Sequence, residues 1–416
     1  MENTPGNKPY VGGQAVIEGV MMRSPRSMAI AVRRPDGTIV VREEAWIGLF
    51  ERWRFLRWPF LRGSAVLIES LYNGIQALNF SSLVQAQSLD ERGAGKPEPR
   101  DAGTTPAQAA THGAAATTAQ AATPAQAATP AQAATAAQAA TSKEATGPAA
   151  GAPPAPAPTP SDKDKLAIAA TITVSFAIAL GLFVALPHLL AWGAGIASGR
   201  DLGVDSFGFH ALDGLFKIMI FVGYIWGIGR IPEIRRVFQY HGAEHKAINA
   251  YEHGQDLTVE NARTWTTFHA RCGTSFVLFV LVLSIFMFAA VFPLVPLVSH
   301  VPLVNHLAMV AIKIPLMLPL AGIAYEINRY AGNHPEQWWV QILVGPGRLM
   351  QQLTTREPTD DQLEIALASM RAALRREADL ARLDLAAAEE AKRAEPLGGR
   401  VLVYRDFGEV AQARPS

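Results

Sequence analysis

Four long apolar runs in the second half of the chain form the clearest pattern of hydrophobic and polar positions. Leu166 to Gly199 carries no charged residue, and the three later runs carry few. An apolar membrane core about 30 Å thick needs about 20 helical residues that rise about 1.5 Å each, and these runs supply them. The sequence therefore predicts four transmembrane helices, at about residues 166–190, 211–229, 274–298 and 306–325.

Charged residues and prolines interrupt two of these runs. Asp213 and Lys217 lie one helical turn apart near one end of the second run, where they are expected to pair. Lys313 lies inside the fourth run, in which Pro315 and Pro319 are expected to produce kinks. These charges within spans raise a transporter as one hypothesis. A substrate pathway, however, normally shows more polar residues facing the helix bundle.

The basic residues of the short loops predict the orientation of the spans, because cationic flanks stay in the cytoplasm. Arg and Lys are frequent in the loop at 230–273, whereas the loops on the other side offer only Arg200. We therefore expect a multi-pass protein of the cytoplasmic membrane. Its 230–273 loop and both of its termini are expected to be cytoplasmic.

The region ahead of the spans, residues 1–82, predicts a small β-hairpin and an amphipathic helix. Met28–Val32 and Thr38–Arg42 flank a turn at Pro35-Asp36-Gly37. Residues 46–64, WIGLFERWRFLRWPFLRGS, interleave Trp with Arg, which suits the lipid headgroup region, although a solvated helix on a soluble subdomain is the alternative. From Ser64 onwards, apolar residues recur at helical spacing.

Low complexity sets residues 83–162 apart. The unit TPAQAA recurs within a run of Ala, Pro, Thr and Gln that has almost no large apolar side chains. Such a segment buries too little surface to offset its ordering entropy, so we predict a disordered linker.

A cytoplasmic helical region is expected at 346–395, after a membrane domain at 163–345 and before a tail at 396–416. Thr359 and Gln362 form a capping-box signature at the start of a helix. Leu363, Leu367 and Met370 then mark one apolar face of that helix.

Composition supports the membrane class. Of 416 residues, 49% are hydrophobic and 18% charged, which is apolar for a soluble protein, and the net charge of +1 gives no reason to expect nucleic acid. The single cysteine, Cys272, excludes an intramolecular disulfide framework. We expect lipid as a partner, and a protein partner or a second copy of the chain remains open.

A transition-metal site is predicted in the 230–273 loop. His241 and His245 are four residues apart, so on a helix both imidazoles project from one face, with Glu244 in the same turn. The order H-x-x-E-H is that of a metallopeptidase pattern in which Glu is the general base. Downstream, His269 and Cys272 supply the ligand types that zinc favours.

The number of protein ligands decides whether a bound metal ion would have a structural or a catalytic role. His241, His245, His269 and Cys272 together would close a tetrahedral site, whereas three of them would leave an open position beside Glu244 or Glu252. Taken singly, each residue is more typical of hydrogen bonding or core packing than of ligation.

Close backbone approach is predicted for the glycine-rich segment VGGQAVIEGVMMRSP, which contains no phosphate-loop pattern. Its one carboxylate, Glu18, is expected to be exposed to solvent rather than part of a site.

Several blocks of sequence together carry a family resemblance: GGQAVIEGVMMRSP, RFLRWPFLRGS, YHGAEHKAINAYE, LTVENART, FHARCGTSF and LTTREPTDDQLEIALASM. They resemble the YqhQ-like bacterial membrane proteins, over roughly residues 8–82 and 163–376. The resemblance implies a metal-dependent membrane protein and no settled substrate. The Ala/Pro/Gln/Thr insertion and the extended C-terminal tail depart from the family pattern.

Together these patterns predict a mainly α-helical polytopic membrane protein with about four transmembrane helices, a small N-terminal β-hairpin region and a cytoplasmic C-terminal helix. The leading functional hypothesis is a divalent-metal site, most simply zinc, in a membrane-associated metallohydrolase. The alternatives are a non-enzymatic scaffold or assembly factor with a structural metal, and a transporter.

Overall fold

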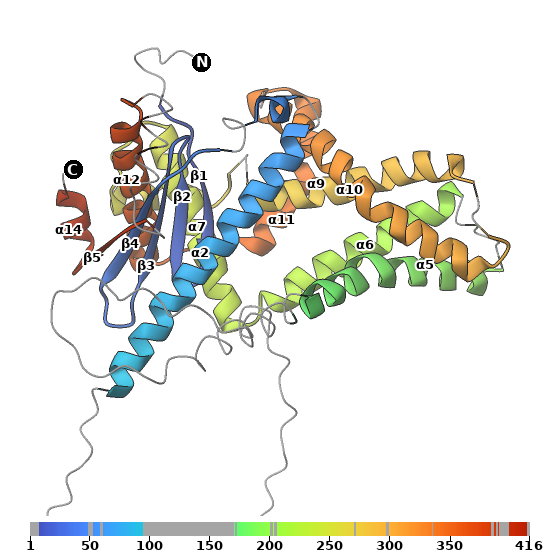
Figure 1. Ribbon diagram of the computed structural model, residues 1–416, viewed down its shortest axis with the longest axis horizontal. Coiled ribbons are helices and arrows are strands. Elements are labelled where there is room, and N and C mark those ends of the chain that lie inside the picture. Colours follow the sequence, from blue (N-terminus) through green and yellow to red (C-terminus); the bar gives the residue numbers. More distant parts are fainter. Residues whose placement is uncertain are drawn as a thin grey trace, which may run out of the picture. The chain divides into compact units, whose positions relative to one another are not determined.

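The computed structural model describes residues 8–48, 53–58, 61–94, 170, 173–199, 203, 206–269, 272–296, 299–334, 336–383, 387, 390 and 399–413. Helices account for most of the described chain, and an antiparallel sheet contains strands from both ends of the sequence (Figure 1). The mainly α class with a small N-terminal β region is therefore confirmed. The predicted linker lies outside the described residues, except for residues 83–94, which belong to a helix.

Four helices are long and apolar enough to cross a membrane: Thr173–Ala197, Phe207–Ile228, Phe276–Leu294 and Leu303–Ala331. The first contains a π-helical turn, Gly181–Ala185, that leads into α5 (Leu186–Ala197). The others lie in α6 (Phe207–Ile228), α9 (Gly273–Val291) with the turn after it, and α10 (Pro302–Asn333). The prediction of four candidate membrane-spanning helices is confirmed.

The sheet has five antiparallel strands in sequence order: β1 (Gly12–Val16), β2 (Gly19–Arg23), β3 (Ser27–Arg33), β4 (Ile39–Ala45) and β5 (Arg400–Tyr404). The predicted hairpin is β3 and β4, with Ala31 opposite Val41. Gly37 allows its turn, since its φ is 94°. The sequence analysis placed no strand at β1, β2 or β5, and β5 lies in the stretch expected to be a tail.

The two faces of the sheet are both covered by helices. Val20, Ala31 and Val41 lie in one buried cluster with α7 (Pro232–Glu252) and α12 (Asp360–Leu380). The alternate residues Met21, Ile30 and others pack in a second cluster with α2 (Leu61–Ala94). This follows from the two-residue period of a strand. A sheet covered by helices on both faces needs apolar residues on both faces. β2 and β3 are therefore nearly continuous apolar runs and not alternating ones.

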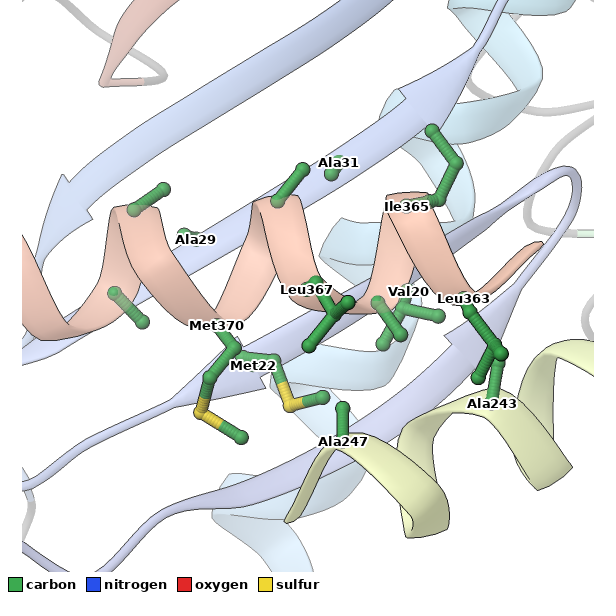
Figure 2. Close-up of a cluster of buried hydrophobic side chains, with 14 of the residues drawn as sticks. Val20, Met22, Ala29, Ala31, Ala243, Ala247, Leu363, Ile365, Leu367 and Met370 are labelled. Carbon is green, nitrogen blue, oxygen red and sulfur yellow. The ribbon is translucent and has the colours of Figure 1, made fainter. Parts of the chain in front are cut away.

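α7 occupies the first half of the segment at 230–273 that was expected to connect two spans. Its Ala243 and Ala247 lie four residues apart and face Val20, Met22 and Leu363 in the core (Figure 2). Small side chains let a helix pack closely on a sheet. The loop that remains is short, and it contains α8 (Val259–Arg263).

Among the described residues, two helices reach into the C-terminal helical region. α11 (Trp338–Thr354) ends before an extended link, and α12 then begins at the predicted capping box, in which Thr359 and Gln362 bond reciprocally. The capping box is therefore confirmed. α14 (Phe407–Gln412) follows β5 and buries Val410 against the same core.

α2 packs its small and polar face on the sheet and exposes its large apolar residues. Leu67, Leu71 and Ile75 are exposed, whereas Asn73 and Ala77 are buried. Trp53 and Trp58 are exposed as well, but Trp46 is buried among the sheet residues, which differs from the interfacial position expected for it.

Candidate metal centre

α7 brings His241 and His245 to one side of the helix, away from the alanines that pack on the sheet. Their rings lie 4.4 Å apart between centroids. Nδ1 of His241 donates to the carbonyl of Thr354 at 2.9 Å, and Nδ1 of His245 donates to the carbonyl of Thr267 at 2.5 Å. Because a carbonyl only accepts, both imidazoles present an Nε2 lone pair, which is the state a metal ligand needs.

Cys272 completes the cluster from another element. It is the residue that precedes α9, it is buried, and its Sγ lies 3.2 Å from Nε2 of His241. The ligand atoms of His241, His245 and Cys272 all lie within 4.8 Å of one another. Zinc bonds of about 2.0–2.1 Å to nitrogen and about 2.3 Å to sulfur hold donor atoms about 3.3–3.6 Å apart, so small rotations of these side chains suffice to close a site.

Burial keeps His245 in the form that binds metal. Desolvation lowers its pKa, opposed by a contact with the Cys272 thiol. A neutral imidazole is thereby favoured at neutral pH.

His269, the fourth expected ligand, lies beside the cluster but turns to a different partner. Its ring centroid is 5.6 Å from that of His245, and its Nε2 is 3.4 Å from Oε2 of Glu252. Gln351 holds the backbone of His269, through bonds to its N–H and its carbonyl. Among the described residues, the compact cluster therefore has three ligands and not the four that would close a tetrahedron.

Glu244 is buried between α7 and β1. A Cβ on Gly13 would lie 2.7 Å from its Cγ, so only glycine on β1 leaves room for this carboxyl group. Burial raises the pKa of Glu244 to about 7, and the nearby His241 opposes this rise. Glu252, the other predicted base, is exposed and lies beside His269.

Residues that sequence reasoning missed position the ligands. Thr354 at the end of α11 and Thr267 before Cys272 supply the carbonyls, and no motif marks a backbone acceptor. Gly242 does leave a signal within YHGAEH, because a Cβ there would lie 2.0 Å from the carbonyl oxygen of Arg356. The glycine lets the segment after α11 approach α7 between the two histidines.

Glu18 was expected to face solvent, and the structure gives it partners instead. Both carboxylate oxygens accept from Arg236 at 2.5 Å, and Tyr240 donates to one of them at 3.1 Å. Glu18 has a φ of 51°, in a turn between β1 and β2. Glu18 therefore ties the β1–β2 turn to the first half of α7, through Arg236 and through Tyr240, which directly precedes His241.

The fold and the site define a membrane protein that combines four apolar spans, a helix-covered sheet and a buried His/Cys cluster. The chain belongs to the family described as "Protein of unknown function (DUF1385)", which matches residues 58–376. It is 30% identical over 379 residues to the "Uncharacterized protein YqhQ" of Bacillus subtilis (strain 168). The alignment covers 89% of this chain and 94% of that protein. The family resemblance is confirmed. No solved structure matches the chain.

Proposed function

We propose that this chain is a metal-dependent membrane protein in which His241, His245 and Cys272 bind one divalent ion, most simply zinc. The proposal rests on the approach of two imidazoles and one thiol, whose ligand atoms all lie within 4.8 Å of one another. A backbone carbonyl fixes the orientation of each imidazole through its Nδ1. Imidazole and thiolate are the ligand types that zinc prefers.

A set of three protein ligands favours catalysis over a purely structural role. Three ligands leave one position of a tetrahedron for water, and a bound zinc ion would supply a water that ionises near neutral pH. Glu244 lies on the same turn as both histidines and is the candidate general base, with Glu252 the second candidate. Hydrolysis is the reaction class this arrangement fits.

The surroundings point to a substrate at the membrane surface. Cys272 directly precedes the α9 span, and α2 exposes a row of apolar residues that suits the headgroup region. We infer from the basic residues around α7 that the site faces the cytoplasm of a bacterial cell, with both termini on that side.

A scaffold with a structural metal is the second candidate function, and the position of the cluster between two helices favours it. The cluster joins α7, which packs on the sheet, to α9, which spans the membrane, so an ion there would hold the two together. His269 would then turn from Glu252 to become the fourth ligand.

Metal content of the purified chain tests the proposal. We expect about one zinc ion per chain in the wild type and a loss of metal in His241→Ala, His245→Ala and Cys272→Ser. The matched control is His253→Ala, because His253 is exposed and stacks on Trp265 outside the cluster. Equal metal content in all five proteins would overturn the site.

Coordination then separates the two candidates. X-ray absorption at the zinc edge should show three protein ligands and one oxygen for the hydrolase. Four protein ligands, with one lost in His269→Ala, would favour the scaffold.

A further inference from the structure

Among the described residues of the spans, six ionisable side chains are buried at positions remote in sequence from the candidate metal centre. They come from α5, α6 and α10, and each is at most 7% exposed. They are His188, His210, Asp213, Lys217, His306 and Lys313. The charged members Asp213, Lys217 and Lys313 stand out in the sequence, and the structure adds three buried histidines on the same helices.

Hydrogen bonds connect four of these side chains in a line. Lys313 Nζ lies 2.6 Å from Asp213 Oδ2 and 3.2 Å from Nδ1 of His188. The other ring nitrogen of His188, Nε2, lies 2.8 Å from Nδ1 of His306. The line therefore runs from an ion pair, through both nitrogens of one imidazole, to a second imidazole.

The line leads from the interior of the bundle to its end opposite α7. Lys313 lies ten residues after Leu303, the first residue of its span, which is about 15 Å along the helix axis. His306 lies three residues after Leu303, about 4.5 Å along the axis, so it is close to the water at that end.

The cluster carries more positive than negative charge. Lys217 and Lys313 both face Asp213, at 3.6 Å and 2.6 Å from Oδ2, while Oδ1 of Asp213 is buried and has no hydrogen-bond partner among the described residues. From α9 and the turn after it, the residues near Lys313 are Phe288 and Phe292, which are uncharged. His210 stacks on Phe292. An excess ammonium inside a membrane is costly, and loss of one proton removes that cost.

We propose that this hydrogen-bonded line is a proton-exchange site that opens to the side of the membrane opposite α7. Lys313 gives an N–H proton to Nδ1 of His188, and His188 gives its Nε2 proton to Nδ1 of His306. His306 gives its own Nε2 proton to water. Lys313 becomes neutral, Lys217 and Asp213 remain as a balanced pair, and both imidazoles change from the Nε2–H to the Nδ1–H tautomer.

The tautomer of His188 is the measurable signature. We would record ¹⁵N NMR spectra of the full chain, labelled at its imidazoles and held in lipid nanodiscs, from about pH 5 to about pH 9. Comparison with His188→Gln assigns the signal. In the wild type we expect His188 to change from Nε2–H to Nδ1–H as the pH rises.

Lys313→Arg separates proton exchange from a purely structural ion pair. Arginine keeps the positive charge beside Asp213 but does not deprotonate in proteins, so His188 should stay in the Nε2–H form throughout. Ser284→Ala, which changes another buried polar residue within a span, should behave as the wild type.

Two results would overturn the proposal: a single His188 tautomer over the whole range in the wild type, or a change in Lys313→Arg like that of the wild type. If Lys313→Arg does not fold, His306→Gln replaces it, since an amide accepts the His188 hydrogen bond but does not relay a proton. In that variant a fixed His188 tautomer supports the site, and an unaltered change contradicts it.

Discussion

Single glycines and threonines decide how closely elements approach the metal centre. Gly242 lies between the candidate ligands His241 and His245 and leaves no room for a Cβ beside the backbone of Arg356, while Gly13 makes room for Glu244. Thr354 and Thr267 set the tautomers of the two histidines through their carbonyls. The ligands themselves are therefore only part of what orients the site.

Gly242→Ala should destabilise the protein and lower its metal content together. The added Cβ would lie 2.0 Å from the Arg356 carbonyl oxygen, and the N–H of Arg356 bonds to the Phe238 carbonyl at 2.9 Å, so the backbone has little freedom to move. We expect a loss of about 1–3 kcal/mol, measured as a lower unfolding midpoint in detergent.

Gly223→Ala is the matched control for that variant. Its Cβ would meet no heavy atom within 4 Å, so the unfolding midpoint should stay or rise slightly. A Gly242→Ala protein with the midpoint and zinc content of the wild type would show that the approach of the Arg356 segment is not tight.

At the scale of elements, α7 and α12 both pack on the sheet. Both cover the same face of the sheet with small or aliphatic residues, and α7 also carries two of the three candidate metal ligands on another side. α12 begins at a capping box that satisfies amide groups at its N-terminus.

Thr359→Ala should cost about 1 kcal/mol of stability, because the side-chain bond to the third residue of α12 is lost. Denaturant unfolding followed by fluorescence measures the change. Thr359→Ser keeps the hydroxyl group and should remain within a few tenths of a kcal/mol of the wild type. Equal losses in both variants would show that the methyl group, and not the cap, is what matters.

On the scale of the whole molecule, the two ends of the chain meet in one sheet. β5 pairs with β4, with Val403 opposite Val40, and α14 buries Val410 in the core shared with β1–β4 and α12. The candidate spans and the candidate metal centre therefore lie in sequence between two segments that fold together.

Deletion of residues 397–416 should lower the unfolding midpoint and promote aggregation. The deletion exposes the edge of β4 and removes the buried Val410. Size-exclusion chromatography and thermal unfolding in detergent check both effects. Val403→Thr, a change at an exposed β5 position, should leave both unchanged; a monodisperse deletion protein as stable as this control would contradict the prediction.

Metal removal should destabilise the wild type through the link between α7 and α9. A chelator removes the free energy of metal binding, which is about 2.7 kcal/mol at a free metal concentration one hundred times the Kd. We expect a chelator to lower the unfolding midpoint of the wild type and not that of Cys272→Ser. The same shift in both proteins would mean that the chelator acts elsewhere.

Local and periodic features could be predicted from the sequence. The four spans follow from the length and continuity of apolar runs, the β3–β4 hairpin from strands around a Pro-Asp-Gly turn, and the start of α12 from Thr359 and Gln362. The spacing of His241 and His245 placed both on one side of a helix, whichever elements surround it.

Only the tertiary structure decided what depends on contacts between distant segments. β5 pairs as a strand because β4 offers it an edge, and α7 packs on the sheet through its alanines. His269 lies beside Glu252 and outside the cluster of His241, His245 and Cys272, so three of the four candidate ligands come together, and no spacing encodes that choice. The line from Lys313 to His306 likewise joins helices that are remote in sequence, and hydrogen bonding between such helices is set by packing.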